Sequence, residues 1–102
     1  MGRDQVRVLV ADDDARVRWA VQTLLMQGPE PSAVRDCSDV GSLAIQMKEF
    51  EPDAVLLDWE LPGKPAAALL LACDGAESRP KVIILSARPE AEQEALASGA
   101  DA

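Results

Sequence analysis

Apolar residues recur along the chain in two alternating patterns. Four short runs rich in Val, Leu, Ile and Ala are typical of strands that are covered on both faces of a parallel sheet. They occupy residues 6–11, 33–37, 54–57 and 81–85. The segment after each run has its apolar residues at helical spacing or begins with a proline that suits a helix start, which predicts a helix there.

The first two predicted helices are amphipathic. The apolar stripe of the first consists of Val17, Ala20, Val21, Leu24 and Leu25, and that of the second consists of Val40, Leu43, Ala44, Met47 and Phe50. Both stripes should face the sheet. Trp19 lies off the first stripe, so we expect its side chain to be partly exposed. Ser38 or Asp39 can cap the second helix.

Strand and helix alternate four times with short connections. A third helix is predicted from Pro65 to about residue 73, and a fourth over residues 90–98 with Gly99 as its C-cap. This alternation predicts an α/β fold, a doubly wound parallel sheet with helices on both faces. The 102 residues suffice for one small domain. Residues 100–102 stand where a fifth strand would begin.

Composition narrows the function. Hydrophobic residues make up 48 % of the chain and aromatic residues 3 %, so the core should be aliphatic. The formal net charge of −8 argues against binding to a nucleic-acid backbone, and the lack of His excludes a His triad, a His metal site and a phosphohistidine donor. Cys37 and Cys73 fit no metal-ligand spacing and are expected to be small, buried or half-buried thiols in a reducing cytoplasm. Without a leader or a membrane-length apolar run, we expect a soluble cytoplasmic protein.

Three groups of polar or small residues follow directly after three of the predicted strands. If these strands are parallel, the groups meet at the carboxyl edge of the sheet, where open α/β sheets bind ligands. A cluster of carboxylates at one edge repels itself unless a hard cation joins it, and Mg²⁺ prefers one or two carboxylates together with phosphate oxygens. The groups are Asp12-Asp13-Asp14, Asp58 and Ser86-Ala87.

Each carboxylate can be given a role in phosphoryl transfer. Asp58 ends an otherwise apolar strand, as expected for a carboxylate nucleophile that becomes an acyl phosphate. Mg²⁺ held by Asp13 and Asp58 would neutralise charge on the transferred group, with Asp12 acting directly or through water. The backbone carbonyl of Glu60, two residues past the nucleophile, could complete the coordination.

The third group would act on the phosphoryl group itself. Ser86 offers a hydroxyl to a phosphoryl oxygen, and Ala87 is small enough to leave the pocket open. Simpler interpretations exist for all three groups: Asp12 to Asp14 could only cap the first helix, and an Asp or a Ser-Ala after a strand is usually a turn. Their coincidence at one sheet edge favours a site. Arg16 and Arg18 are interpreted as solvated helix charges.

The same groups occur within motifs that are specific in combination. With them the chain resembles, over its whole length, the receiver domain of bacterial response regulators, the phosphoacceptor module of two-component systems. The motifs are Asp12-Asp13, Leu57-Asp58-Trp59-Glu60-Leu61-Pro62-Gly63, Ser86-Ala87 and Ser98-Gly99-Ala100-Asp101-Ala102.

The resemblance implies a flavodoxin-like fold with strand order 2-1-3-4-5 and a single receiver domain over residues 1–102. Asp58 would accept a phosphoryl group from a sensor histidine kinase, a phosphotransfer protein or a small acyl phosphate. Asp12 and Asp13 would form the acidic pair for Mg²⁺, with Mn²⁺ as an alternative, and Ser86 would be the switch hydroxyl. The domain would switch partner interactions rather than act as an enzyme. The resemblance also allows for an output domain beyond residue 102. A fourth strand left at the sheet edge would allow a homodimer, and the net charge and the short apolar runs predict no direct contact to nucleic acid or membrane.

Three departures from the family pattern stand out. Gly63 leads into Lys64-Pro65 instead of a Gly-x-Asp-Gly turn, and Ser86 replaces the commoner Thr, which keeps the hydroxyl. The family's invariant Lys follows the Gly-Ala-Asp-Ala motif by a few residues, beyond Ala102. We therefore expect the domain to be incomplete at its C-terminus, lacking the last strand and helix, with the fourth strand at the sheet edge.

Two other functions compete with this interpretation. Asp12-x-Asp14 resembles the first sequence motif of haloacid-dehalogenase-type phosphatases. That motif has Thr or Val two residues after the second Asp, where this chain has Arg16. Without the Lys-bearing strand, the chain could also be a non-switching interaction module that binds partners regardless of phosphorylation.

Overall fold

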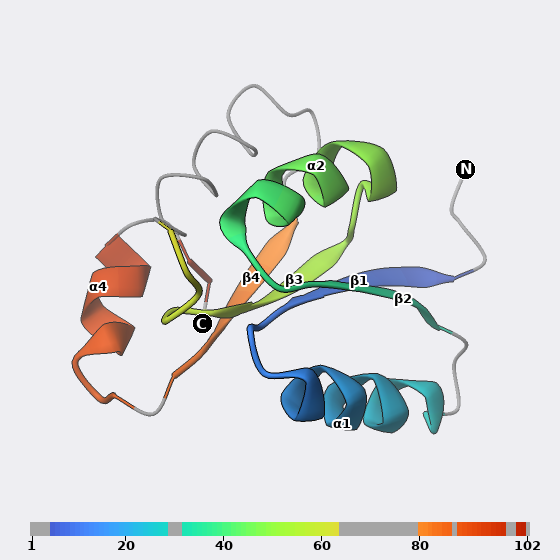
Figure 1. Cartoon of the computed structure of the whole chain (residues 1–102), viewed down its shortest axis with the longest axis horizontal. Coiled ribbons are helices and arrows are strands. Elements are labelled where there is room, and N and C mark those ends of the chain that lie inside the picture. The colour runs from blue at the N-terminus through green and yellow to red at the C-terminus, as the bar shows by residue number, and fades with distance from the viewer. Residues whose placement is uncertain (1–4, 29–31, 64–79, 87, 98–99, 102) are drawn as a thin grey trace.

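The computed structural model describes residues 5–28, 32–63, 80–86, 88–97 and 100–101 (Figure 1). The predicted strands are present, each within one residue of its expected bounds. The third predicted helix, Cys73, Ala87 and Gly99 lie outside the described residues. The elements are β1 (Val6–Ala11), α1 (Ala15–Met26), β2 (Ser32–Cys37), α2 (Val40–Phe50), β3 (Ala54–Asp58), β4 (Lys81–Leu85) and α4 (Ala91–Ala97).

The four strands form one parallel sheet in the order β2-β1-β3-β4. This order confirms the predicted sequence of the first four strands. In the register, Ala11 at the end of β1 pairs with Cys37 on one side and with Leu57 on the other, and Asp58 pairs with Leu85. The carboxyl ends of the strands are therefore level with one another.

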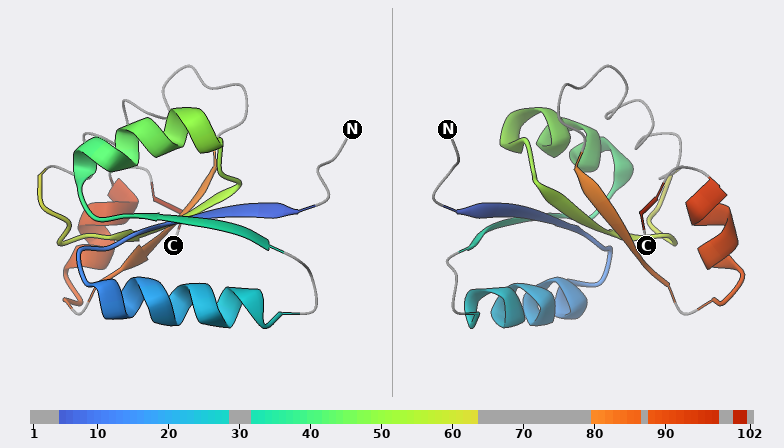
Figure 2. Two further views of the ribbon diagram at one scale, coloured as in Figure 1. Left: turned by 45° about the vertical axis from the view of Figure 1, so that its right-hand side comes forward. Right: turned by 180° about the vertical axis from the view of Figure 1, so that it is seen from behind.

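Helices lie on both faces of the sheet, with α1 on one face and α2 on the other (Figure 2). The main core lies under α2, whose predicted stripe contributes the buried side chains of Leu43, Met47 and Phe50. These pack against strand residues that alternate along β1, β3 and β4, as a doubly covered sheet requires. The strand residues of this core are Leu9, Ala11, Val55, Leu57 and Val82.

The predicted stripe of α1 is only partly correct. No residue of α1 is fully buried, and Ala20 and Leu24 are exposed, the latter at 69 %. Among the described elements, α1 packs mainly against β2 and β1, and Ala20 and Leu24 lie outside that contact. Trp19 is 70 % exposed, as its place off the stripe predicted.

The β4 strand is the edge of the described sheet, but one of its residues already has a partner. The Asp101 N–H donates to the Val82 carbonyl at 2.9 Å, and the Val82 N–H donates to Asp101 Oδ2 at 2.8 Å. Ala100 packs against the core beside them. Further along β4, the side chain of Ile83 is 39 % exposed on the α1 face.

Cys37 agrees with the prediction of a small buried thiol. It is a free cysteine at the end of β2, and burial raises the pKa of its thiol to about 11. The thiol is therefore protonated at neutral pH and a poor nucleophile.

The unequal packing of the two helices gives a stability prediction. Leu43→Ala in α2 should lower the free energy of unfolding by about 2–5 kcal/mol, because it empties a fully buried site. Leu24→Ala in α1 should change it by less than about 0.5 kcal/mol, because that side chain is already in water. Urea unfolding followed by circular dichroism measures both; equal losses would mean that α1 is covered to the same extent as α2.

Candidate functional site

Three carboxylates meet where β1 and β3 end. Asp12 and Asp13 follow β1, and Asp58 is the last residue of β3. One oxygen of each carboxylate lies within 4.8 Å of the others. The parallel register brings them together, because it sets the ends of β1 and β3 side by side.

Asp12 is the most firmly held of the three. Its side chain is 6 % exposed, its N–H donates to the Cys37 carbonyl at 3.1 Å, and its Oδ1 accepts from the Asp14 N–H at 2.8 Å. The N-cap of α1 is Asp14, which accepts from the Arg16 N–H at 2.9 Å. The capping interpretation thus holds for Asp14 alone, and its hydrogen bond to Arg16 lowers the pKa of Asp14.

Asp58 is half-buried at the centre of the cluster. Its Oδ1 accepts a hydrogen bond of 2.9 Å from the Glu60 N–H. Burial raises the pKa of Asp58, the Glu60 N–H opposes that rise, and the charges of Asp12 and Asp13 add to it. Three carboxylates crowded at one sheet edge are the donor set that a hard divalent cation fits.

Ser86 lies at the end of β4, next in the sheet to β3. Its side chain is exposed, and its Oγ accepts from the Arg88 N–H at 3.0 Å. Ala87, predicted to keep the pocket open, lies outside the described residues. The roles predicted for Ser86 and for the Glu60 carbonyl stay predictions.

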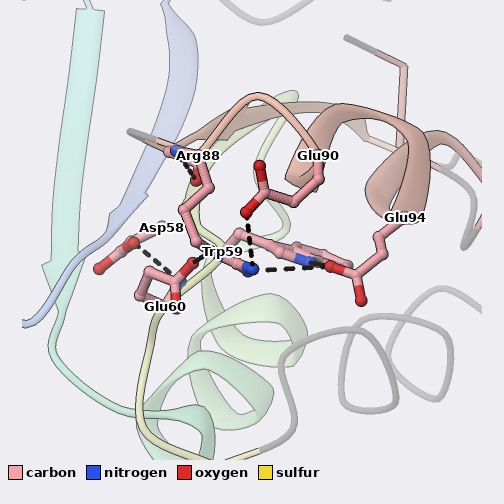
Figure 3. Close-up of polar contacts among 7 residues, drawn as sticks. Asp58, Trp59, Glu60, Arg88, Glu90 and Glu94 are labelled. Atoms are coloured by element: carbon pink, nitrogen blue, oxygen red, sulfur yellow. Dashed lines mark hydrogen bonds and ion pairs between the residues drawn. The ribbon is translucent and has the colours of Figure 1, made fainter.

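A network around Arg88 was missed by the sequence analysis (Figure 3). The Arg88 Nε donates to Glu60 Oε1, and its guanidinium lies 3.7 Å from a Glu90 oxygen and 3.8 Å from one of Glu94. The Trp59 Nε1–H donates to Glu94 Oε2 at 3.3 Å. The network therefore joins the turn after Asp58 to the start of α4. The only signal in the sequence was an arginine among acids two residues after Ser86.

Arg18 was also misjudged as a solvated charge. Its side chain is 19 % exposed, compared with 92 % for Arg16. Arg18 Nη1 donates to the Asp12 carbonyl at 2.7 Å, and Nε donates to Asp36 Oδ2 at 3.0 Å. Nothing in the local sequence distinguishes it from Arg16.

Comparison with known proteins decides the family. The family model of the response regulator receiver domain matches residues 8–102. The chain belongs to the response regulator receiver family. This receiver domain has the fold and the two-component signalling function of its family. The match to the family model favours this function over the phosphatase alternative. No helix in the described part of the chain is long and apolar enough to cross a membrane.

Similar sequences occur in larger proteins. The receiver is 34 % identical over 103 residues to a protein-glutamate methylesterase/protein-glutamine glutaminase of Rhodopseudomonas palustris, covering 98 % of this chain and 28 % of that protein. It is 36 % identical over 100 residues to the phosphate regulon transcriptional regulatory protein PhoB of Klebsiella pneumoniae, covering 93 % of this chain and 42 % of PhoB. The chain thus spans less than half the length of these relatives.

Solved structures agree with the fold. The response regulator domain of Thermotoga maritima CheB superimposes with a TM-score of 0.81 at 28 % identity, over 95 % of this receiver and 75 % of that chain. The signal receiver domain of NarL from Mycobacterium tuberculosis gives a TM-score of 0.81 at 30 % identity, over 96 % of this receiver and 81 % of that chain.

The crowded carboxylates predict an unusual stability effect. Asp58→Asn should increase the free energy of unfolding at pH 7 in EDTA, because the folded state holds the Asp58 proton more tightly than the unfolded state does. The raised pKa means that wild-type stability increases as pH falls through that pKa. The gain of Asp58→Asn should therefore vanish below the ordinary carboxyl pKa of about 3.9.

Asp14→Asn is the matched control for this measurement. Arg16 lowers the pKa of the Asp14 carboxyl, so replacing this carboxylate by a neutral amide should not stabilise the fold at pH 7. Urea unfolding of both variants between pH 3 and pH 8 makes the comparison. A gain for Asp14→Asn equal to that for Asp58→Asn would point to total charge rather than to the cluster.

Proposed function

We propose that Asp58 is the phosphoacceptor of this receiver and that residues 1–102 belong to one receiver domain. The observation that carries the proposal is that one oxygen each of Asp12, Asp13 and Asp58 lies within 4.8 Å of the others, at the carboxyl edge of a parallel sheet. Asp58 is half-buried, so the surrounding protein excludes part of the solvent while one side stays open to a donor.

Asp12, Asp13 and Asp58 would hold a divalent cation, Mg²⁺ or Mn²⁺, together with the Glu60 carbonyl, and Asp12 would act directly or through water. The donor set supports this assignment, because it consists of oxygens alone, three of them from carboxyl groups. A cation held there would neutralise negative charge on the phosphoryl oxygens.

The chain's own residues position the reaction. An Asp58 oxygen forms the bond to phosphorus while the bond from phosphorus to the donor's leaving group breaks. The Glu60 N–H donates to Asp58 Oδ1 and so fixes the orientation of the carboxylate, which leaves Oδ2 to attack. Ser86 lies at the same edge of the sheet. Because its Oγ accepts a hydrogen bond from the Arg88 N–H, its own O–H is left to donate to a phosphoryl oxygen. Ala87 would leave that approach open.

The domain would act as a switch in the cytoplasm and not as a turnover enzyme. Its phosphoryl donor would be a sensor histidine kinase or a phosphotransfer protein, as family membership supports. The relatives carry such a domain within longer proteins, which supports an output domain as the partner of this one. The exposed Ile83 on the edge strand β4 supports a homodimer as a second arrangement.

Phosphorylation at Asp58 is tested directly by mass. Incubation with acetyl phosphate and Mg²⁺ should add one phosphoryl group to the intact chain, and mild base should remove it, because an acyl phosphate is base-labile. Asp58→Asn should abolish the adduct. Asp53→Asn, five residues earlier, should retain it. An adduct that survives in Asp58→Asn would place the phosphoacceptor elsewhere.

Cation binding is tested by fluorescence of Trp59, which adjoins Asp58 and packs partly against the core. In a Trp19→Phe background, Mg²⁺ should change Trp59 emission with a Kd on the order of millimolar, because few protein ligands replace the waters of the ion. Asp13→Asn should weaken binding by about tenfold or more. Glu49→Gln, an exposed change on α2, should leave the Kd unchanged. A flat titration of the parent chain would exclude the site.

A further inference from the structure

Arg18 connects three elements next to the acidic cluster. It lies in α1, yet its guanidinium reaches back to the loop that follows β1 and across to Asp36 on β2. Little of its side chain is exposed, in contrast to Arg16 on the same helix. A guanidinium has a fixed, planar set of donors, so bonds from Nε and Nη1 together fix its orientation.

The acceptor on the loop is the carbonyl of the peptide that joins Asp12 to Asp13. The 2.7 Å bond from Arg18 Nη1 fixes the plane of this peptide. The Asp12 N–H, donating to the Cys37 carbonyl, fixes the preceding peptide. Rotation of either peptide would turn the Asp13 side chain relative to Asp58.

The two neighbouring acids differ in how they are held. The Asp12 carboxylate accepts the Asp14 N–H, whereas the Asp13 side chain is exposed, and among the described residues no hydrogen bond holds its carboxylate. The position of Asp13 therefore depends on its backbone. Arg18 is the side chain that fixes that backbone from outside the loop.

We propose that Arg18 is a positioning residue for the cation site: it aligns Asp13 through the Asp12–Asp13 peptide, with Asp36 orienting the guanidinium. This rests on the proposed function, because it assumes that Asp13 is a cation ligand. The charge of Arg18 acts in the opposite sense, since a cation beside the cluster repels a divalent ion. Positioning and charge therefore predict opposite results when Arg18 is replaced.

The test is a Mg²⁺ titration of Arg18→Lys and Arg18→Gln, followed by Trp59 emission in the Trp19→Phe background. Lys keeps the charge but cannot make both bonds of the planar fork. The Kd should rise about tenfold in both variants, the low end of what loss of an outer-sphere hydrogen bond costs a metal site. Arg16→Lys and Arg16→Gln should leave it unchanged. A wild-type Kd for Arg18→Lys with tighter binding by Arg18→Gln would overturn the proposal.

A merely structural role is separated by two further readouts. At saturating Mg²⁺ the phosphorylation rate of Arg18→Lys should return to within about twofold of wild type, because its defect lies in cation affinity. Its thermal midpoint in EDTA should lie far enough above the titration temperature for the chain to be fully folded. A rate that stays low at saturating Mg²⁺ would overturn the positioning role.

Asp36 provides a test that leaves Arg18 in place and serves if the Arg18 variants do not fold. Asp36→Asn and Asp36→Ala remove the same charge, but only Asn keeps an acceptor for Arg18 Nε. The Kd of Asp36→Ala should exceed that of Asp36→Asn by about twofold to threefold. Equal Kd values would overturn the inference alone, whereas a wild-type chain without any response to Mg²⁺ would overturn the proposed cation site as well.

Discussion

The parallel register of the sheet is the constraint on which the rest of this molecule depends. It makes β1 and β3 end level with each other, so the carboxylates of Asp12 and Asp13 lie next to that of Asp58. Burial raises the pKa of Asp58, the Glu60 N–H opposes the rise, and the crowded charges of Asp12 and Asp13 add to it. A fold that tolerates such crowding must stabilise it elsewhere, and here the buried aliphatic core under α2 does so.

The sequence predicted what depends on short-range pattern. Strand bounds, the buried stripe of α2 and the convergence at the sheet edge follow from periodicity together with the rule that parallel strands end at one edge. The flank of α1 was misjudged because its stripe is the same whether or not anything covers it. Leu24 in water and Leu43 in the core look alike in sequence.

The arginines were missed for a different reason. Arg18 pairs with Asp36, 18 residues away, and Arg88 pairs with Glu60, 28 residues away. Both pairings arise only after the fold has brought residues far apart in the sequence together, and the local sequence does not indicate which partner each arginine takes. The residues that surround the acidic cluster are therefore harder to predict than the cluster itself, which is marked by strand ends.

Asp101 has a consequence for the β4 edge. With its main-chain N–H and its carboxylate it engages both backbone groups of Val82. Because side chains alternate with a period of two along a strand, a slip of one residue turns every side chain to the opposite face. A strand that pairs with β4 beyond this point, from this chain or another, therefore has its register set at Val82. Asp101 thus selects one register for pairing along β4, among the several that an apolar strand without this contact would allow.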